Sequence, residues 1–318
     1  MKTIKKVLKV LFIFLLVLSL SGCTQPLRTS KKKTVTNPKT GQSITANILC
    51  KPTDKTTLKI YKENKKILKK DYNIEIDKLP ECKNYKVMAN GYEGLWTSFF
   101  VQPLAWIILK LGTIIKSCGL SLIIVSIIIR FILFPFTKKM AMQSELMKKA
   151  QKDMQRIEKK YEGKNDQESM MKKSQEMSMV YKKHGINPMT SCLVSFIQIP
   201  LLFAFFEAIN RTPAIFEEKF LFLQLGTTPV VGLQNGNIMY ALLVILIGAT
   251  TYFSFKMNAQ DMGTNNQMKS MPIMMTGMII FMGLFMSSAL GIYWITTNVF
   301  TICQNIMVRR SKKEHGKV

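Results

Sequence analysis

The chain has 318 residues, of which 45 are Lys or Arg and 19 are Asp or Glu, so its formal net charge is +26. A soluble nucleic-acid-binding protein could carry this charge, but 47% of the residues are hydrophobic and long stretches have almost no charge. The sequence contains two histidines, and it has neither a paired-cysteine metal spacing nor a glycine-rich phosphate loop. The composition therefore favours a membrane protein with basic aqueous regions over an enzyme or a DNA-binding protein, and we expect no metal site and no cofactor.

Residues 1–22 resemble the signal peptide of a bacterial lipoprotein. Several lysines precede an apolar run over residues 10–20, which is too short to span a bilayer. The run ends in Leu20-Ser21-Gly22-Cys23, which is similar to the lipoprotein box. We therefore expect Cys23 to carry lipid, with acyl chains such as palmitate, and to become the first mature residue outside a bacterial cell; an uncleaved anchor is the alternative.

Residues 23–94 are expected to form a small extracytoplasmic region. Residues 43–50 predict a strand, and Thr53 is a candidate cap for a helix that ends at Asn64. Cys50 and Cys82 would both lie in the oxidising compartment, where a disulfide can form. Two free thiols remain the alternative.

Residues 95–118 are predicted to form an amphipathic helix in the outer membrane interface. The apolar segment 104–115 is short for a span and lies between Pro103 and Lys116. Trp96 and Trp106 are expected at the level of the lipid headgroups.

A membrane-spanning helix needs about 17–25 mainly apolar residues. The nearly uncharged stretch 272–308 is too long for one crossing, so it should turn near Ser287, Ser288 and Gly291. We therefore predict an all-α membrane protein, a bundle of five transmembrane helices with a hydrophilic groove. The predicted spans are residues 120–136, 190–208, 238–255, 272–288 and 290–308.

The distribution of basic residues predicts the orientation. Residues 137–186 and the tail 309–318 are rich in Lys and Arg, whereas the loop 210–237 contains only Arg211 and Lys219. Because basic loops stay in the cytosol, the first two segments should be cytosolic and the N-terminus outside.

The cytosolic segment 137–186 is predicted to be a helical hairpin that turns at residues 163–166. Its apolar residues can pack the two arms together, or they can form a deformable surface for varied hydrophobic segments. The predicted seam comprises Met140, Met147, Ala150, Met154, Ile157 and Tyr161, with Met170, Met177 and Val180 on the return arm.

Arg130 lies inside the first predicted span, where a guanidinium costs between ~2.5 and more than ~10 kcal/mol. No carboxylate is expected at its depth, because Glu207 would lie at the outer end of its helix. Snorkelling to the interface is one way to satisfy this charge. The alternative is a hydrated cavity open to the cytosol. Its predicted polar lining is Ser126, Gln198, Thr296, Thr297, Asn298 and Gln304.

Ordered motifs accompany this arginine. They are Pro135-Phe136-Thr137-Lys138, Tyr181-Lys182-Lys183-His184-Gly185-Ile186-Asn187-Pro188, Phe196-Ile197-Gln198-Ile199-Pro200 and Tyr293-Trp294-Ile295-Thr296-Thr297-Asn298, with Gln304 after them. From about residue 95 onward the chain resembles the YidC/Oxa/Alb family of membrane protein insertases, in the Gram-positive lipoprotein form. The resemblance implies a cationic groove open to the cytosol and to lipid. Arg130 would be the groove arginine, Ser126 the small hydroxyl residue one turn earlier, and Tyr293 and Trp294 the aromatic pair that meets substrate helices.

The chain departs from the family pattern at two places. Val194 and Ser195 follow the cysteine of the second span where a proline is frequent, and Ser254-Phe255 stand where a glutamine is frequent. Part of the polarity expected of the groove is therefore missing.

The resemblance implies an insertase and chaperone for nascent membrane proteins, acting alone or with the Sec translocon. Its partners would be the ribosome, membrane lipids and the signal-recognition-particle receptor, but not DNA. Arg309, Arg310, Lys312 and Lys313 are candidate ribosome or lipid contacts. The competing hypotheses are a small-anion transporter or channel that uses Arg130, and a lipoprotein with no groove. A hydrolase is disfavoured because no Ser/His/Asp set can be assembled in the membrane.

Overall fold

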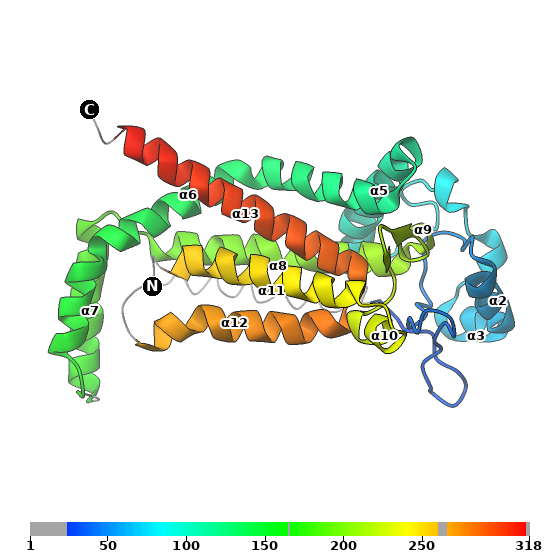
Figure 1. The fold of residues 1–318 in the computed structure, drawn as a ribbon, viewed down its shortest axis with the longest axis horizontal. Helices are drawn as coiled ribbons and strands as arrows, with labels where there is room; N and C mark the ends of the chain where they lie inside the picture. The colour runs from blue at the N-terminus through cyan, green and yellow to red at the C-terminus, as the bar shows by residue number, and fades with distance from the viewer. Residues whose placement is uncertain (1–23, 165, 260–265, 316–318) are drawn as a thin grey trace. The chain divides into compact units, whose positions relative to one another are not determined.

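The computed structural model describes residues 24–164, 166–259 and 266–315, without the side chains of some residues inside these ranges (Figure 1). The chain divides into two compact units. The first unit comprises the described residues up to Val125 together with Leu201–Leu243 and Leu284–Ile292, and the second comprises Ser126–Pro200, Val244–Gly283 and the described residues from Tyr293 onward.

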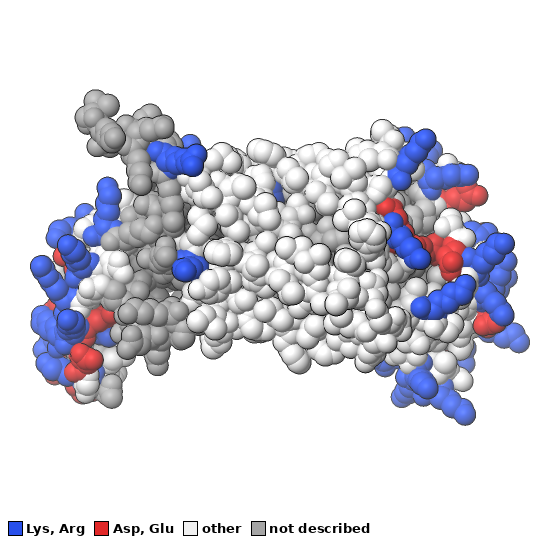
Figure 2. Space-filling model, in the orientation of Figure 1, with Lys and Arg blue, Asp and Glu red and all other residues white. Residues whose placement is uncertain are grey.

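Long helices cover each predicted span. They are α6 (Cys118–Lys160), α8 (Pro188–Arg211), α11 (Met239–Ala259), α12 (Asn266–Phe285) and α13 (Ser288–His315). Helices suit a bilayer because they satisfy their own backbone hydrogen bonds. On the face drawn in Figure 2, most Lys, Arg, Asp and Glu side chains lie toward the ends, and the described surface between them is largely uncharged.

Three helical stretches of the described chain are long and apolar enough to cross a membrane, namely Gly94–Ile115, Cys118–Lys138 and Met239–Met257. Pro272–Phe285 is a shorter apolar helix. The predicted turn coincides with the break between α12 and α13, although Gly291 lies inside α13. The protein is thus mainly helical, with several segments suited to a membrane.

The segment predicted to lie in the interface consists of α4 (Gly94–Trp96), a π-helical turn (Thr97–Val101) and α5 (Gln102–Ile115). Together they are long enough to span a membrane, so length alone does not select the interfacial placement, which stays a prediction. The depth expected for Trp96 stays a prediction, but its side chain is not free to contact headgroups. Its side chain is only 4% exposed, and its indole N–H donates a hydrogen bond of 2.8 Å to Glu207.

The N-terminal part of the first unit contains α2 (Lys55–Glu63) and α3 (Lys65–Tyr72), followed by 3₁₀ turns at Ile76–Lys78 and Cys82–Asn84. One face of α2 buries residues at helical spacing, which pack against apolar residues from the preceding segment. This core comprises Leu27, Ile44, Ala46, Ile48, Ile60, Tyr61, Leu68, Ile76 and Phe216.

Two local predictions in this part need correction. The strand expected over residues 43–50 is reduced to isolated bridges at Ser43 and Thr45, because the chain then bends to place its apolar side chains in the core. The cap of α2 is Asp54 rather than Thr53, since the Asp54 carboxylate accepts the backbone N–H of Thr57 at 2.8 Å.

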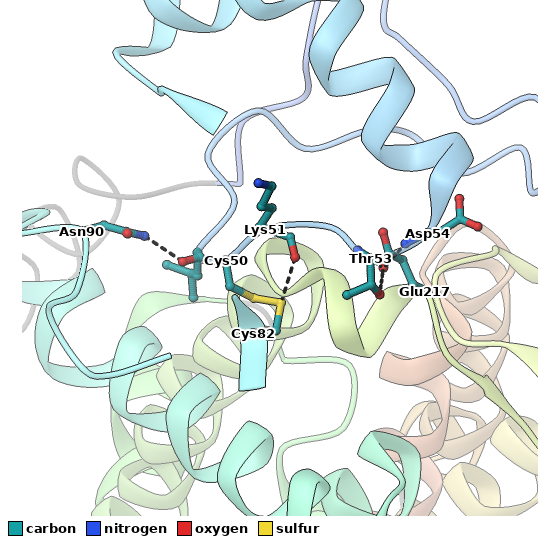
Figure 3. The surroundings of a disulfide bond; sticks show 8 residues. Cys50, Lys51, Thr53, Asp54, Cys82, Asn90 and Glu217 are labelled. Atoms are coloured by element: carbon teal, nitrogen blue, oxygen red, sulfur yellow. Dashed lines mark hydrogen bonds between the residues drawn. A yellow bond between two sulfur atoms is a disulfide. The ribbon is translucent and has the colours of Figure 1, made fainter. Parts of the chain in front are cut away.

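A disulfide joins Cys50 to Cys82, with their Cα atoms 4.9 Å apart (Figure 3). It fastens the turn at Cys82–Asn84 to the segment that leads into α2. The same segment is also held by Glu217, whose carboxylate accepts hydrogen bonds from the backbone N–H groups of Thr53 and Asp54 (Figure 3).

Arg211, at the end of α8, is the largest fully buried side chain of the described residues and is 1% exposed. Its guanidinium forms an ion pair with Glu93 and a longer one, at 3.8 Å, with Glu207. Its Nε donates a hydrogen bond of 2.6 Å to the carbonyl of Asn47, and Nη1 lies 3.5 Å from the hydroxyl of Thr97. The charge is therefore compensated by two carboxylates and by hydrogen-bond acceptors.

Beyond the predicted first span, α6 continues to Lys160 and pairs with α7 (Gln167–Lys183) in the second unit. The predicted hairpin core forms from Ala150, Met154, Ile157, Tyr161, Val180 and Ile186, with Met147 and Met177 partly buried against it. Met170 does not belong to the seam, because its side chain is 54% exposed. The side chain of Met140 lies outside the described residues.

The disulfide predicts a protected pair of thiols. Alkylation of the denatured chain without reductant should leave Cys50 and Cys82 unmodified, and mass spectrometry should recover them in one crosslinked peptide. Replacing both with Ser should destabilise the first unit by up to roughly 3–4 kcal/mol, because the bond closes a loop with a sequence separation of 32. Modification of both cysteines in the untreated protein would rule the bond out.

The hairpin should respond to acid through Asp153. Nε2 of His184 and Nζ of Lys183 each lie 3.0 Å from its carboxylate. These hydrogen bonds, His184 first, lower the pKa of Asp153 from 3.8 to about 2. A lowered carboxyl pKa stabilises the fold above its unfolded-state value, and this contribution is lost as the pH falls toward the folded-state value. We therefore expect the two arms to loosen as the pH falls from about 4 to about 2.

Spin labels at Lys152→Cys and Lys182→Cys would report this loosening as a broader distance distribution. Asp153→Asn should reduce the pH dependence without abolishing it, because hydrogen bonds from Lys160 and Tyr161 also lower the pKa of Glu176. An unchanged acid response in Asp153→Asn would contradict the assignment.

Candidate functional site

A cavity of about 380 Å³ opens between the helices of the second unit. Its lining comes from α6, α8, α11 and α13, and it consists of Arg130, Thr137, Gln198, Ile199, Phe255, Trp294, Thr297, Asn298, Thr301, Gln304 and Asn305. Most of these side chains are hydroxyls or amides, and the lining includes one cation and no carboxylate. The cavity therefore combines hydroxyls, amides and one cation with a larger apolar surface, to which Ile199, Phe255 and Trp294 contribute.

α13 supplies the larger part of this lining. Trp294, Asn298, Thr301 and Asn305 recur at intervals of three or four residues, which places them on one face of the helix. Tyr293 precedes this face by one residue and is buried. The helical period thus explains why only one member of the aromatic pair reaches the cavity.

Thr251 in α11 positions two of these residues. Its hydroxyl oxygen accepts hydrogen bonds from the indole N–H of Trp294 and the amide of Asn298, each at 3.0 Å. Thr251 is itself buried. One hydroxyl therefore fixes an aromatic and a polar group at the cavity wall.

A second polar contact ties α6 to α13. The hydroxyl of Thr137 lies 2.8 Å from Nε2 and 3.1 Å from Oε1 of Gln304. This contact aligns the end of the predicted first span with the last helix, and both side chains also line the cavity.

Arg130 is the only charged residue of the lining given by the described residues. Its Nε is buried and has no hydrogen-bond partner among them, and no ion pair with a described residue involves its guanidinium. The buried Tyr293 is near enough for an electrostatic interaction. The cavity is large enough to hold water, which can hydrogen-bond to a group without a protein partner.

The structure brings together six of the nine residues predicted for the groove, namely Arg130, Gln198, Trp294, Thr297, Asn298 and Gln304, while Thr296 is not among the lining residues. Ser126 and Tyr293 are buried and do not line the cavity. The departure from the family pattern noted at Ser254-Phe255 has a visible consequence, since Phe255 contributes an apolar side chain to the wall.

Four residues that line the cavity or position its wall were not predicted from the sequence, namely Thr137, Thr251, Thr301 and Asn305. Thr137 belongs to the motif Pro135-Phe136-Thr137-Lys138, and Thr301 and Asn305 share a helix face with Trp294. These three residues could therefore have been predicted from the sequence. The sequence did not indicate Thr251, because a threonine inside a helix ordinarily bonds to a carbonyl of its own helix, as Thr250 does.

Other predicted residues lie apart from the cavity or outside the described part. Cys23 is outside the described residues, as are the side chains of Arg309, Lys312 and Lys313, while Arg310 is exposed on α13. The first unit has a cavity of about 560 Å³ whose polar lining includes Gln42 and Glu217, and none of the predicted groove residues line it. Within the described ranges, no group of three or more His, Cys, Asp or Glu could hold a metal ion.

The helices define a helical membrane protein, with a cavity in its second unit that Arg130 lines together with hydroxyls, amides and apolar side chains. The chain belongs to the family described as the 60Kd inner membrane protein, whose model matches residues 110–315. This is the family that the ordered motifs indicated.

Relatives support this assignment. The chain is 37% identical over 215 residues to "Membrane protein insertase YidC" of Alkalihalophilus pseudofirmus, a match that covers 67% of this chain and 81% of the relative. It is 34% identical over 216 residues to "Membrane protein insertase MisCA" of Bacillus subtilis, covering 67% and 79%.

The fold is similar to that of a solved structure, "Active YidC insertase crystal structure with the first transmembrane domain resolved", with a TM-score of 0.50 and 21% identity. That match covers 78% of this chain and 52% of the other, so the chain matches about half of the length of that structure.

Thr251→Val should disturb the cavity wall. The substitution removes the acceptor shared by Trp294 and Asn298, which should cost about 1–3 kcal/mol, less any compensation by cavity water. We expect a lower unfolding midpoint and stronger quenching of Trp emission by acrylamide. Thr250→Val is the matched control, because the Thr250 hydroxyl bonds to the carbonyl of Leu246 in its own helix. Equal effects of the two substitutions would contradict the positioning role of Thr251.

Proposed function

We propose that this protein inserts nascent membrane proteins and assists their folding through the cationic cavity, which acts as a hydrated groove open to the cytosol. In this proposal the chain crosses the membrane five times, with a lipidated N-terminus at Cys23 outside and the C-terminus in the cytosol. The family assignment and the names of the relatives support the insertase activity. The uncompensated charge of Arg130 in the cavity is the observation that carries the proposed mechanism.

The mechanism is physical and breaks no covalent bond. A nascent helix gains about 25 cal/mol per Å² when its apolar surface leaves water. Its polar flank must first cross ~30 Å of hydrocarbon, which is the barrier to insertion. Water in a half-channel shortens the dry part of this path, so the barrier falls.

Each part of the cavity has a proposed role. Arg130 attracts the acidic or polar tail of the client, and Gln198, Asn298 and Gln304 offer hydrogen bonds in place of water. Trp294, fixed by Thr251, gives the apolar helix a surface along which it leaves for lipid. Ser126 and Tyr293 pack behind the lining and support it.

The basic segments proposed to lie in the cytosol are also proposed to bind the ribosome that synthesises the client proteins. The hairpin of α6 and α7 and the tail residues Arg309, Arg310, Lys312 and Lys313 supply positive charge for ribosomal RNA or anionic lipid. The Sec translocon and the signal-recognition-particle receptor are further proposed partners. The protein would insert some clients together with them and others alone.

Arg130→Ala should impair insertion of clients that have acidic outer tails. An opposite charge about 4 Å away is worth about 1 kcal/mol in water, so we expect roughly a fivefold loss for acidic tails and little change for neutral ones. Insertion into liposomes that contain the purified protein measures this. Arg130→Lys should retain most activity, and Lys256→Ala, which removes an exposed cation from α11, is the matched control.

Unaltered insertion by Arg130→Ala would refute the role of the arginine. The same liposomes separate the insertase from a small-anion transporter or channel. An insertase should give no flux of small anions, whereas flux that depends on Arg130 would favour the transporter.

A further inference from the structure

A short β-hairpin in the first unit presents two large apolar side chains to the outside. It lies between α9 (Pro213–Phe216) and α10 (Pro229–Gln234), and it pairs β1 (Lys219–Phe220) with β2 (Leu223–Gln224). Its two-residue turn consists of Leu221 and Phe222, which we call the hairpin tip. These side chains are 77% and 71% exposed.

The tip breaks the usual chemistry of a hairpin turn. Two-residue turns favour Asn-Gly or similar pairs, because the backbone there adopts positive φ angles. Leu221 has a φ of 55°, a conformation that bulky side chains rarely adopt. The side chains of Leu221 and Phe222 are mostly exposed, so they bury little apolar surface within the hairpin. An apolar environment outside the hairpin would favour these two residues.

The base of the hairpin is fastened to the start of α6. The carboxylate of Glu218 accepts hydrogen bonds from the hydroxyl of Ser117 at 2.7 Å and from the backbone N–H groups of Cys118 and Gly119 at 2.5 and 3.2 Å. The ring of Phe220 packs on Gly119 so closely that a Cβ atom there would lie 2.5 Å from it. These contacts fix the tip at the Cys118 end of a candidate membrane span.

The other side of the hairpin is fastened to the start of α11. The amide of Asn237 donates a hydrogen bond of 3.0 Å to the carbonyl of Phe222, and the hydroxyl of Tyr240 accepts one of 3.0 Å from the backbone of Gln224. Leu223, next to the tip, is buried. The hydrogen bonds on both sides of the hairpin therefore hold the tip in its exposed position.

Apolar surface continues from the tip onto α11. Ile238, which follows the residue that binds the Phe222 carbonyl, is 74% exposed, and Met239 and Leu242 are exposed beyond it. Met239–Met257 is a candidate membrane span by length and composition, and the exposed apolar side chains on this part of α11 suit contact with lipid. Lys219 at the base is exposed and suits a phosphate headgroup.

We propose that the hairpin tip inserts into the acyl-chain layer of the leaflet that surrounds the Cys118 end of α6. Lipid accounts for the tip because the exposed apolar surface is continuous with that of α11, a candidate membrane span, so one hydrocarbon layer would cover both. The inserted tip anchors the loop between α8 and α11 at a fixed depth. This proposal requires a membrane-embedded chain, and it does not depend on the proposed insertase function.

Phe222→Trp in lipid bilayers tests the proposal with little change of shape. The full chain has three native Trp residues, so the added emission is measured as the difference from the unchanged protein. Phospholipids brominated at shallow or deep positions of the acyl chains act as quenchers. We expect blue-shifted added emission that loses most of its intensity, with shallow bromines more effective than deep ones.

Two variants calibrate the result. Leu242→Trp on α11 should be quenched by bromines at a greater depth, and Lys66→Trp, on the exposed surface of α3, should not be quenched. Behaviour of Phe222→Trp like that of Lys66→Trp would overturn the proposal, because the tip would then lie in water. Blue-shifted emission that brominated lipid does not quench would also overturn it, because protein would then cover the tip.

Discussion

Removing a guanidinium from water costs several kcal/mol, and the contacts around Arg211 all reduce that cost. Two carboxylates, a carbonyl and a hydroxyl surround this side chain and leave it fully buried. Arg130 is also withdrawn from bulk water, but its described surroundings offer amides and hydroxyls and no carboxylate. The first arrangement satisfies the charge from within, whereas the second provides no carboxylate among the described residues, and this difference motivates the proposed role of Arg130.

The sequence was informative where a pattern repeats along one helix. Apolar length predicted where α6, α8, α11, α12 and α13 lie, because each helix satisfies its own backbone hydrogen bonds. The heptad spacing similarly predicted the core of the α6 and α7 hairpin. The prediction that Met170 belongs to this core was wrong, since an apolar residue near the end of one arm need not have a partner on the other arm.

The sequence was silent where a site depends on residues far apart in the chain. Glu93 and Arg211 meet across 118 positions, Trp96 and Glu207 across 111, and Thr251 and Trp294 across 43. No local sequence period relates such residues. From the sequence alone, Arg211 was therefore interpreted as a cation of a loop and Trp96 as a residue of the membrane interface. The apolar residues within 43–50, where a strand was predicted, instead pack into the core of a segment with few backbone partners.

Arg130 and Leu221 both violate a rule of local structure without compensation from described neighbours. A natural sequence retains such violations where the surroundings or the function reward them. An apolar leucine with positive φ gains from hydrocarbon, while an unpaired guanidinium gains from water, so the two residues report opposite environments. A soluble protein offers no hydrocarbon to Leu221, and a dry bundle offers no water to Arg130. The two proposals, a hairpin tip in hydrocarbon and a hydrated groove at Arg130, together describe a chain embedded in lipid and hydrated inside, and this is the physical condition under which a polar segment can enter a membrane at low cost.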